Sequence, residues 1–399
     1  SKLYFGCGEI YDDYGKDDKC EKHVFFNKAV LEAIKYIDFI PNIIHLNDYH
    51  TAMIPLIYKV KYKKYNEYRN IKFLFTIHNL KYQGIFNANR IAELLEIELS
   101  YFKENNILFN GQMNCMKVGV LFADMITTVS KTYAKEITSV KFGEGLNELL
   151  KKNEYKLEGI INGIDYHENN PETDLLIFNN YNCNNFINEK VKNKLLLQKR
   201  MGLREDENII MIGIVSRLTD MKGFDIIREI FEKLISYNVQ FVLLGVGQND
   251  IIDSFRKLEN KYPDKVRVNI MFSNELAHKI YASADIYLMP SKFEPCGLSQ
   301  LIALRYGTIP IVHAIGGLND TIESYNECDN IGNGFSFDNY DANELLFSLK
   351  KAMLLCSDKE KWNQLVLRAM ESDNSFHKSA KEYIKIYKEL IVSCPEEEK

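Results

Sequence analysis

"SKFEPCGLSQLIALRYGTIPIV", residues 291–312, runs from a polar loop through a helical pattern into an apolar strand pattern. Gly307 ends the helical pattern, as glycine commonly does. Glu294 stands just before the helix, where Ser, Thr, Asp or Asn would ordinarily form the cap. The first backbone N–H groups of this helix, at residues 297–299, lack partners within it, so the sequence predicts that a ligand binds there.

Apolar, β-branched runs alternate with helical patterns along most of the chain. One such pattern, at residues 223–237, places on one helical face Ile226, Ile227, Ile230, Phe231 and Leu234. Parallel sheets with helices on both faces have this pattern, so we predict an α/β fold. The predicted strands are residues 42–46, 71–78, 124–130, 157–163, 208–216, 240–247, 265–272, 284–291 and 308–312.

A polar stretch without periodicity, residues 163–185, separates two groups of strands. With a length of 399 residues, this break predicts two doubly wound Rossmann-like domains with a ligand cleft between them. Only four convincing strands precede the break, whereas about six are usual in such a domain. We therefore expect the first domain to be incomplete, lacking its first strands.

The composition disfavours several classes of function. A formal net charge of −5 argues against nucleic acid as the main partner. The eight cysteines form no C-x-x-C pair and no zinc-type cluster, so we expect neither a metal site nor a disulfide framework. We recognise no secretory leader and no bilayer-spanning run, and therefore expect no membrane partner and a cytoplasmic location.

The loop "SRLTDMKGF", residues 216–224, follows a predicted strand. Arg217 and Lys222 bracket the strand-to-helix turn, and Gly223 opens the next helix. Two cations beside a helix amino end suit a pyrophosphate and can neutralise a leaving nucleoside diphosphate without a metal. A solvated loop with surface cations is the alternative interpretation.

Glu294 does not suit a phosphate, because the two negative charges repel. Its carboxylate suits neutral sugar hydroxyls, or positive charge that develops at an anomeric carbon, and we expect it to be exposed in the cleft. A surface glutamate without function is the alternative. For Cys296, a packed thiol is a better interpretation than a nucleophile.

Polar residues also follow two predicted strands of the first half, in "HLNDYHTA" and "TIHNLKYQGIF". His78 is a candidate for binding a sugar hydroxyl, and Asp48 for binding acceptor hydroxyls. A structural hydrogen bond is the alternative for each of them. Tyr281 is a candidate for flanking a nucleobase, although an aromatic residue on a helix more often belongs to the core.

Six segments resemble, in order, the motifs of bacterial glycogen synthases and plant starch synthases, which are retaining glycosyltransferases of the GT-B architecture. They are "HLNDYHTA", "TIHNLKYQGIF", "INGIDYHENNPETD", "SRLTDMKG", "YLMPSKFEPCGLSQLIALRYGTIPIV" and "GGLNDTI". The resemblance implies an acceptor-side domain at residues 1–163 plus 376–399, where the last helix crosses back. It implies a nucleotide-sugar-binding domain at residues 164–375.

The resemblance implies transfer of glucose from ADP-glucose to the non-reducing 4-hydroxyl of an α-1,4-glucan, with retention of configuration. Its catalytic residues would be the diphosphate-binding cations Arg217 and Lys222, Glu294 at the glucosyl unit, and His78 beside the donor sugar. The other donor-binding residues would be Asn79, Tyr281 near the adenine, Cys296, Gly297, Leu298 and Ser299. Asp48 and Tyr49 would lie on the acceptor side, with Tyr49 providing a stacking face for glucan.

The resemblance further implies a front-face substitution in which the departing phosphate accepts the proton of the incoming hydroxyl. No D-x-D motif appears, so we expect no metal and no cofactor. The Lys-Thr-Gly-Gly loop of the family is absent, and the chain opens on "SKLYFGCGEIYDD", so we expect a fragment. Two alternatives stay open: a transferase that uses UDP-glucose, and an inactive glucan-binding fragment. A plant-like source would imply the plastid.

Overall fold

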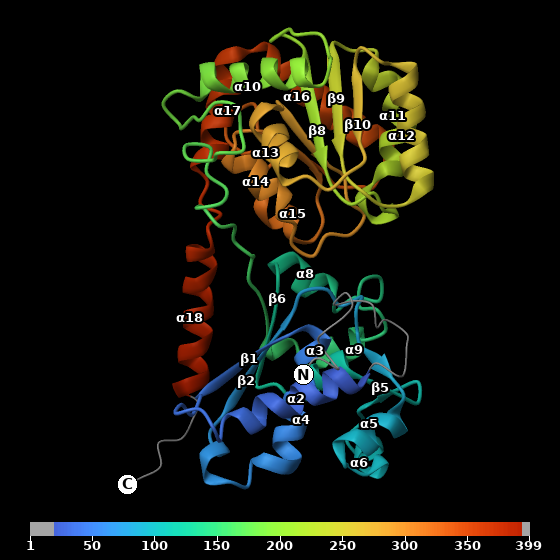
Figure 1. Ribbon diagram of the computed structural model, residues 1–399, viewed down its shortest axis with the longest axis vertical. Coiled ribbons are helices and arrows are strands. Elements are labelled where there is room, and N and C mark those ends of the chain that lie inside the picture. Colours follow the sequence, from blue (N-terminus) through green and yellow to red (C-terminus); the bar gives the residue numbers. More distant parts are fainter. Residues whose placement is uncertain (1–19, 393–399) are drawn as a thin grey trace. The chain divides into compact units, whose positions relative to one another are not determined.

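Two parallel sheets organise the computed structural model, which describes residues 20–392 (Figure 1). Within that range, unit 1 comprises residues 20–160 and 381–392, and unit 2 comprises residues 161–380. The sequence placed the corresponding boundaries after residues 163 and 375. The opening segment on which the fragment interpretation depends lies outside the described residues.

The sheet of unit 1 has the order β1-β2-β6-β7, and all four strands are parallel. Its strands are β1 (Ile43–Asn47), β2 (Lys72–Ile77), β6 (Met125–Thr128) and β7 (Leu157–Gly159). The helices are α2 (Cys20–Ala33), α3 (Asp48–Thr51), α4 (Ile54–Ile57), α5 (Ala88–Leu95), α6 (Leu99–Glu104), α7 (Cys115–Phe122), α8 (Lys131–Glu136) and α9 (Asn147–Lys152). All four predicted strands of the first half are therefore present; β1 is shifted by one residue, and the other three are shorter than predicted.

A small antiparallel sheet in unit 1 was not predicted. It has the order β3-β5-β4, from β3 (Ile85–Phe86), β5 (Gln112–Asn114) and β4 (Leu108–Phe109). Strands of two or three residues are too short to show an alternating pattern in the sequence.

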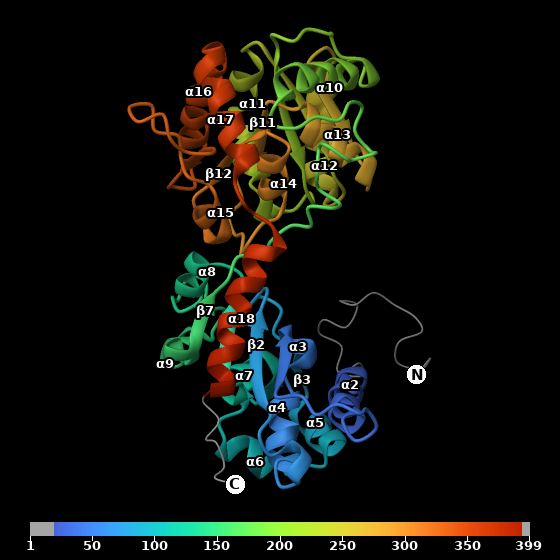
Figure 2. The same ribbon diagram turned by 90° about the vertical axis from the view of Figure 1, so that its left-hand side faces the viewer.

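Helix α18 (Phe376–Val392) belongs to unit 1 from residue 381 onward (Figure 2). Ile386 and Leu390 pack against Leu74 of β2 and against Ile160. Such burial typically contributes about 1.5–3 kcal/mol for each large apolar side chain. The carboxyl-terminal segment is thus part of the core of unit 1.

The sheet of unit 2 has six parallel strands in the order β10-β9-β8-β11-β12-β13. Its strands are β8 (Ile210–Val215), β9 (Val239–Leu244), β10 (Val266–Asn269), β11 (Ile286–Met289), β12 (Ile309–His313) and β13 (Phe335–Phe337). From β8 the chain first builds the sheet outward through β9 and β10, and then returns to the other side of β8. The order therefore reverses between β8 and β11, which is where doubly wound sheets bind ligands.

Eight helices accompany these strands: α10 (Phe186–Arg200), α11 (Phe224–Ile235), α12 (Asn249–Lys261), α13 (Asn274–Ser283), α14 (Ser299–Arg305), α15 (Gly316–Thr321), α16 (Ala342–Ser357) and α17 (Lys359–Glu371). The predicted apolar face of α11 is confirmed, because all five of its residues are buried. Strand β13 was not predicted, since it has only three residues.

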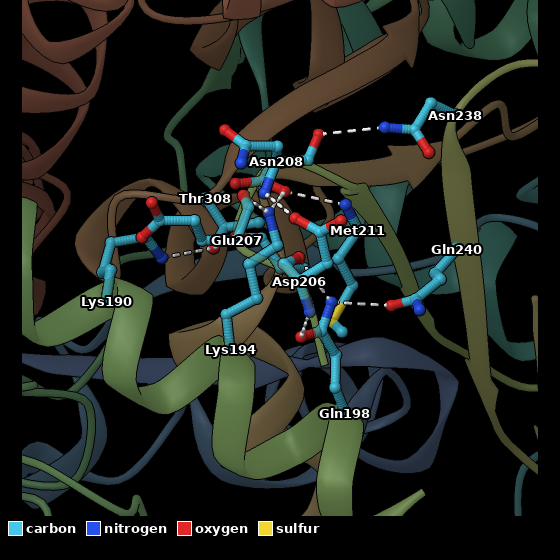
Figure 3. A network of polar contacts seen from close by, with 12 residues as sticks. Lys190, Lys194, Gln198, Asp206, Glu207, Asn208, Met211, Asn238, Gln240 and Thr308 are labelled. Atoms are coloured by element: carbon cyan, nitrogen blue, oxygen red, sulfur yellow. Dashed lines mark hydrogen bonds and ion pairs between the residues drawn. The ribbon is translucent and has the colours of Figure 1, made fainter. Parts of the chain in front are cut away.

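A polar network fixes the amino ends of the strands of unit 2 (Figure 3). Lys190, Lys194 and Gln198 follow one another at intervals of one helical turn along α10 and point to the same side. Lys194 Nζ lies 2.6 Å from Asp285 Oδ2, and Gln198 donates to Gln240 at 2.8 Å. The carboxyl ends of the strands, at the opposite edge, remain for a ligand site.

None of the helices within residues 20–392 combines the length and the hydropathy that a membrane-spanning segment needs.

Candidate functional site

A cavity of about 600 Å³ lies in unit 2 at the carboxyl ends of β8 and β9. Ser216 and Arg217, which follow β8, form part of its wall, and Gly245 after β9 forms another part. Helix α13 contributes His278 and Tyr281. Because β8 and β11 are adjacent and parallel, the loop after β11 ends at the same edge of the sheet.

Arg217 is exposed at this cavity. Its guanidinium forms no hydrogen bond or ion pair with any residue of the described part of the chain. A guanidinium without a protein partner is suited to bind phosphate oxygens in a bidentate manner. The geometry is thus compatible with the predicted role of Arg217.

Lys222 and Glu294 come together, although 72 positions separate them in the sequence. Lys222 ends a short 3-10 turn (Asp220–Lys222), and its ammonium forms an ion pair with the Glu294 carboxylate. Ser291 Oγ donates to the same carboxylate at 3.2 Å. The side chains of Lys222 and Glu294 are 20% and 12% exposed, so the expectation of an exposed Glu294 is wrong.

Gly223 makes this approach possible. Its φ of +78° is a left-handed conformation, and a Cβ atom there would lie 2.0 Å from the Pro290 carbonyl oxygen. Only glycine lets the turn after β8 pass this close to the end of β11. The sequence feature that opens α11 therefore also positions Lys222 against Glu294.

The predicted helix start is confirmed, since α14 begins at Ser299 with Leu298 as its N-cap. Gly297 has a φ of +74°, and its carbonyl accepts a hydrogen bond from Gln300 at 3.0 Å. Cys296 is buried, and burial raises the pKa of its thiol to about 12. The interpretation of Cys296 as a packed thiol is confirmed, and its side chain is a poor candidate for contacting the donor.

Tyr281 belongs to the core rather than to a stacking surface. It is 4% exposed, and its ring lies against those of Tyr287 and Tyr306 at centroid distances of 5.3 and 6.3 Å. Ser299 Oγ contacts Met289 Sδ at 4.0 Å, so its hydroxyl also points inward. Tyr281 therefore lines the cavity but has little ring surface free, which makes it a poor candidate for stacking on the adenine.

Phe272 is an aromatic side chain that sequence reasoning missed. It follows β10, lines the cavity with Arg217, and is 91% exposed. An exposed phenylalanine beside a cavity has a free face for a planar ligand. In the sequence it is the last residue of the predicted strand 265–272, and nothing there marks it as functional.

In unit 1, Asp48 and His78 lie at the ends of the neighbouring strands β1 and β2. Asp48 Oδ1 accepts a hydrogen bond from the His78 backbone N–H at 2.8 Å. His78 Nε2 lies 2.9 Å from Asn47 Oδ1, and Asn79 Oδ1 accepts from the Lys81 N–H at 3.0 Å. Burial raises the pKa of Asp48, and its φ of +55° is unusual for a residue with a Cβ atom.

In unit 1, the predicted role of Tyr49 as a stacking face for glucan is not supported by its packing. It is 2% exposed, and its ring stacks on that of His50 at a centroid distance of 3.8 Å. A Cβ atom at Gly84 would lie 2.3 Å from the Tyr49 ring, which shows how closely this ring is packed. Tyr49 therefore has no free face on which a glucan can stack.

Within residues 20–392, no group of three or more His, Cys, Asp or Glu side chains is arranged to hold a metal ion. The absence of a metal requirement stays a prediction about the reaction.

Known families match both halves of the chain. The model for the starch synthase catalytic domain matches residues 1–152, and the model for glycosyl transferases group 1 matches residues 197–367. The glycogen synthase of Clostridioides difficile (strain 630) is 48% identical over 397 residues, which are 98% of this chain and 82% of that protein. The glycogen synthase of Clostridium perfringens (strain 13 / Type A) is 51% identical over 391 residues, covering 98% of this chain and 80% of that protein.

A solved structure agrees with these relatives. The catalytic domain of starch synthase IV from Arabidopsis thaliana, bound to ADP and acarbose, has a TM-score of 0.89 and 32% identity. The match covers 98% of this chain and 80% of that chain. The resemblance found in the motifs is confirmed: the chain belongs to the glycogen synthase and starch synthase family of GT-B glycosyltransferases.

Proposed function

We propose that this glycosyltransferase transfers glucose from ADP-glucose to the non-reducing end of an α-1,4-glucan, with retention of the α configuration. The observation that carries the proposal is the ion pair of Lys222 with Glu294, which joins the loops after β8 and β11, where the strand order of unit 2 reverses. Arg217 belongs to the same loop as Lys222 and lines the cavity at the end of β8. The starch synthase of similar structure was solved with ADP, the group that ADP-glucose would release.

The chain provides the charges that the departing diphosphate needs. The bond between the glucosyl C1 and the phosphate oxygen breaks, and its electron pair stays on the phosphate. Arg217 is available to neutralise that charge because it has no protein partner in the described part of the chain, and Lys222 adds a second cation. The acceptor 4-hydroxyl forms the new bond to C1 on the same face, and its proton passes to the departing phosphate.

Glu294 is placed to contact the glucosyl unit rather than the phosphates. A carboxylate accepts hydrogen bonds from sugar hydroxyls and stabilises positive charge at C1. Its contact with Lys222 holds it in place before the donor binds. In unit 1, Asp48 and His78 are the proposed partners of the sugars, because each lies at the carboxyl end of a parallel strand.

We assign the base-stacking role to Phe272 instead of Tyr281. Phe272 has an exposed ring at the same cavity as Arg217. A nucleotide whose phosphates bind Arg217 can therefore stack its base on the Phe272 ring. No metal is needed in this proposal, because Arg217 and Lys222 supply the positive charge. Activity is therefore expected to persist in the presence of EDTA.

The test is glucose transfer to glycogen by the purified chain, with ADP-glucose and UDP-glucose compared at equal concentrations. Incorporation from ADP-glucose, with new linkages that are α by NMR, supports the proposal. A preference for UDP-glucose would overturn the donor assignment. Binding to glycogen without any turnover would favour the glucan-binding alternative.

A further inference from the structure

One polar side chain of the cavity has no part in the proposed mechanism. His278 lies on α13 and lines the cavity together with Arg217 and Phe272. Its Nδ1 atom lies 2.7 Å from Asp174 Oδ2, although 104 positions separate the two residues. Its side chain is only 9% exposed, so the imidazole is held in one orientation by its surroundings.

Asp174 is itself fixed by several hydrogen bonds. Its Oδ2 also accepts from the Tyr306 hydroxyl at 2.6 Å, and its Oδ1 accepts from the Leu176 N–H at 2.8 Å. Burial would raise the pKa of Asp174, but the hydrogen bonds from His278, Tyr306 and Leu176 outweigh it and hold the pKa below its usual value. Asp174 is therefore a carboxylate, which accepts hydrogen bonds and donates none.

This carboxylate determines which nitrogen of His278 carries the proton. Nδ1 must donate to Asp174, so in the neutral imidazole Nε2 is the acceptor. Nε2 has no hydrogen-bond partner in the described part of the chain, and it is not among the atoms that the fold buries without a partner. An orientated acceptor at a ligand cavity selects for a hydrogen-bond donor on the ligand.

We propose that His278, orientated by Asp174, is a specificity-determining residue that accepts a hydrogen bond from the nucleoside part of the sugar donor. The inference rests on the proposed function, because it requires a nucleotide in this cavity. Two groups of an adenosine can donate to Nε2: the exocyclic amine of the base and a ribose hydroxyl. The hydrogen bond is the same for both, and analogues of ADP distinguish them.

The experiment measures by calorimetry the binding of ADP, IDP, 2′-deoxy-ADP and 3′-deoxy-ADP to the full chain and to its His278→Phe variant. IDP lacks the amine, and each deoxy analogue lacks one hydroxyl. One hydrogen bond corresponds to about a three- to tenfold change in affinity. The unaltered chain is expected to bind the analogue that lacks the donating group more weakly than ADP, by about that factor. The His278→Phe variant is expected to bind ADP and that analogue with equal affinity.

His377→Phe is the matched control, because His377 is exposed and does not line the cavity. If His278→Phe does not fold, His278→Lys repeats the test, since its ammonium can still donate to Asp174 and cannot accept a hydrogen bond from the ligand. The proposal is overturned if the variant binds ADP as tightly as the unaltered chain does. It is also overturned if the affinity of the variant falls by the same factor for all four nucleotides. Failure of the unaltered chain to bind ADP would overturn the proposed function as well.

Discussion

Charge at the candidate site is distributed unevenly among three side chains. The Arg217 guanidinium has no hydrogen-bond or ion-pair partner within residues 20–392, whereas the side chains of Lys222 and Glu294 neutralise each other. A substitution of Arg217 therefore breaks no side-chain contact within the described part of the chain, whereas a substitution of Glu294 leaves a half-buried ammonium without its counterion. A variant of Arg217 is therefore expected to change activity without changing stability, whereas a variant of Glu294 is expected to change both.

Replacing Arg217 by alanine is expected to lower kcat/KM for ADP-glucose by about 100- to 1,000-fold, because one charge that stabilises the departing diphosphate is lost. Stability is expected to change by less than about 0.5 kcal/mol, since the side chain is exposed. Steady-state kinetics and urea unfolding measure the two effects. A large loss of stability would show that Arg217 has a structural partner instead.

Glu294→Gln keeps the shape of the side chain and removes its charge. We expect kcat to fall by about 100-fold or more, because the positive charge developing at the glucosyl carbon loses its stabilising carboxylate. Glu323→Gln, at an exposed position, is the matched control and should retain full activity. If the kcat of Glu294→Gln equals that of the control, Glu294 serves the fold alone.

At the strand ends of unit 2, the conformation of the turns determines which side chains come together. Two glycines with a similar backbone conformation allow backbone strain to be distinguished from steric clash. Gly223 has a φ of +78° and is closely confined by Pro290, while Gly111 has a φ of +79° and open space within 4 Å of where a Cβ atom would lie. The strain of the left-handed backbone is common to both, and the steric clash belongs to Gly223 alone.

Gly223→Ala is therefore expected to lose more stability than Gly111→Ala, by at least about 1 kcal/mol in urea unfolding. It is also expected to lower activity, because a shift of the turn moves Lys222 away from Glu294. Equal losses of stability in the two variants would mean that the turn relaxes around the new methyl group.

The contact between α18 and the sheet of unit 1 gives stability a dependence on pH. His45 Nδ1 lies 2.8 Å from the Tyr387 hydroxyl, and Nε2 lies 2.6 Å from Thr76 Oγ1. Burial, together with the charge of His78, lowers the pKa of His45 to about 4. Between pH 4 and about 6.5 the unfolded chain binds the extra proton, so the free energy of unfolding rises with pH in this window.

His45→Gln removes this titration and keeps a side chain that can hydrogen-bond. Its free energy of unfolding is expected to rise less steeply with pH over the same window, by up to about 1.4 kcal/mol per pH unit. Urea unfolding at a series of pH values measures the slope. Parallel curves for the variant and the unaltered chain would show that His45 does not titrate there.

For the molecule as a whole, sequence reasoning recovered the architecture better than the site. The nine predicted strands are all present, and the most deeply buried of them, such as β9 and β12, form continuous apolar runs that the sequence displays. Lys222 and Glu294 were identified because their loops follow such strands. Phe272 was missed because one aromatic residue at a strand end has no pattern, and His278 because its contact with Asp174 joins distant parts of the chain.

For Tyr281 and Tyr49 the sequence predicted a ligand contact, whereas the structure shows a buried side chain. The family resemblance implied a donor-binding role for Tyr281 and an acceptor-side role for Tyr49, yet both side chains are buried against neighbouring aromatic rings. A motif identifies a segment, whereas the packing around the segment decides which of its side chains a ligand can reach.

The pairing of Lys222 with Glu294 has a consequence for timing. The Lys222 ammonium and the Glu294 carboxylate neutralise each other, and most of both side chains is shielded from solvent. In the proposed reaction, a bound diphosphate would compete with Glu294 for the Lys222 ammonium, and the carboxylate would then keep an uncompensated negative charge. On this proposal, binding of the donor would itself give Glu294 the free charge with which it stabilises the glucosyl carbon.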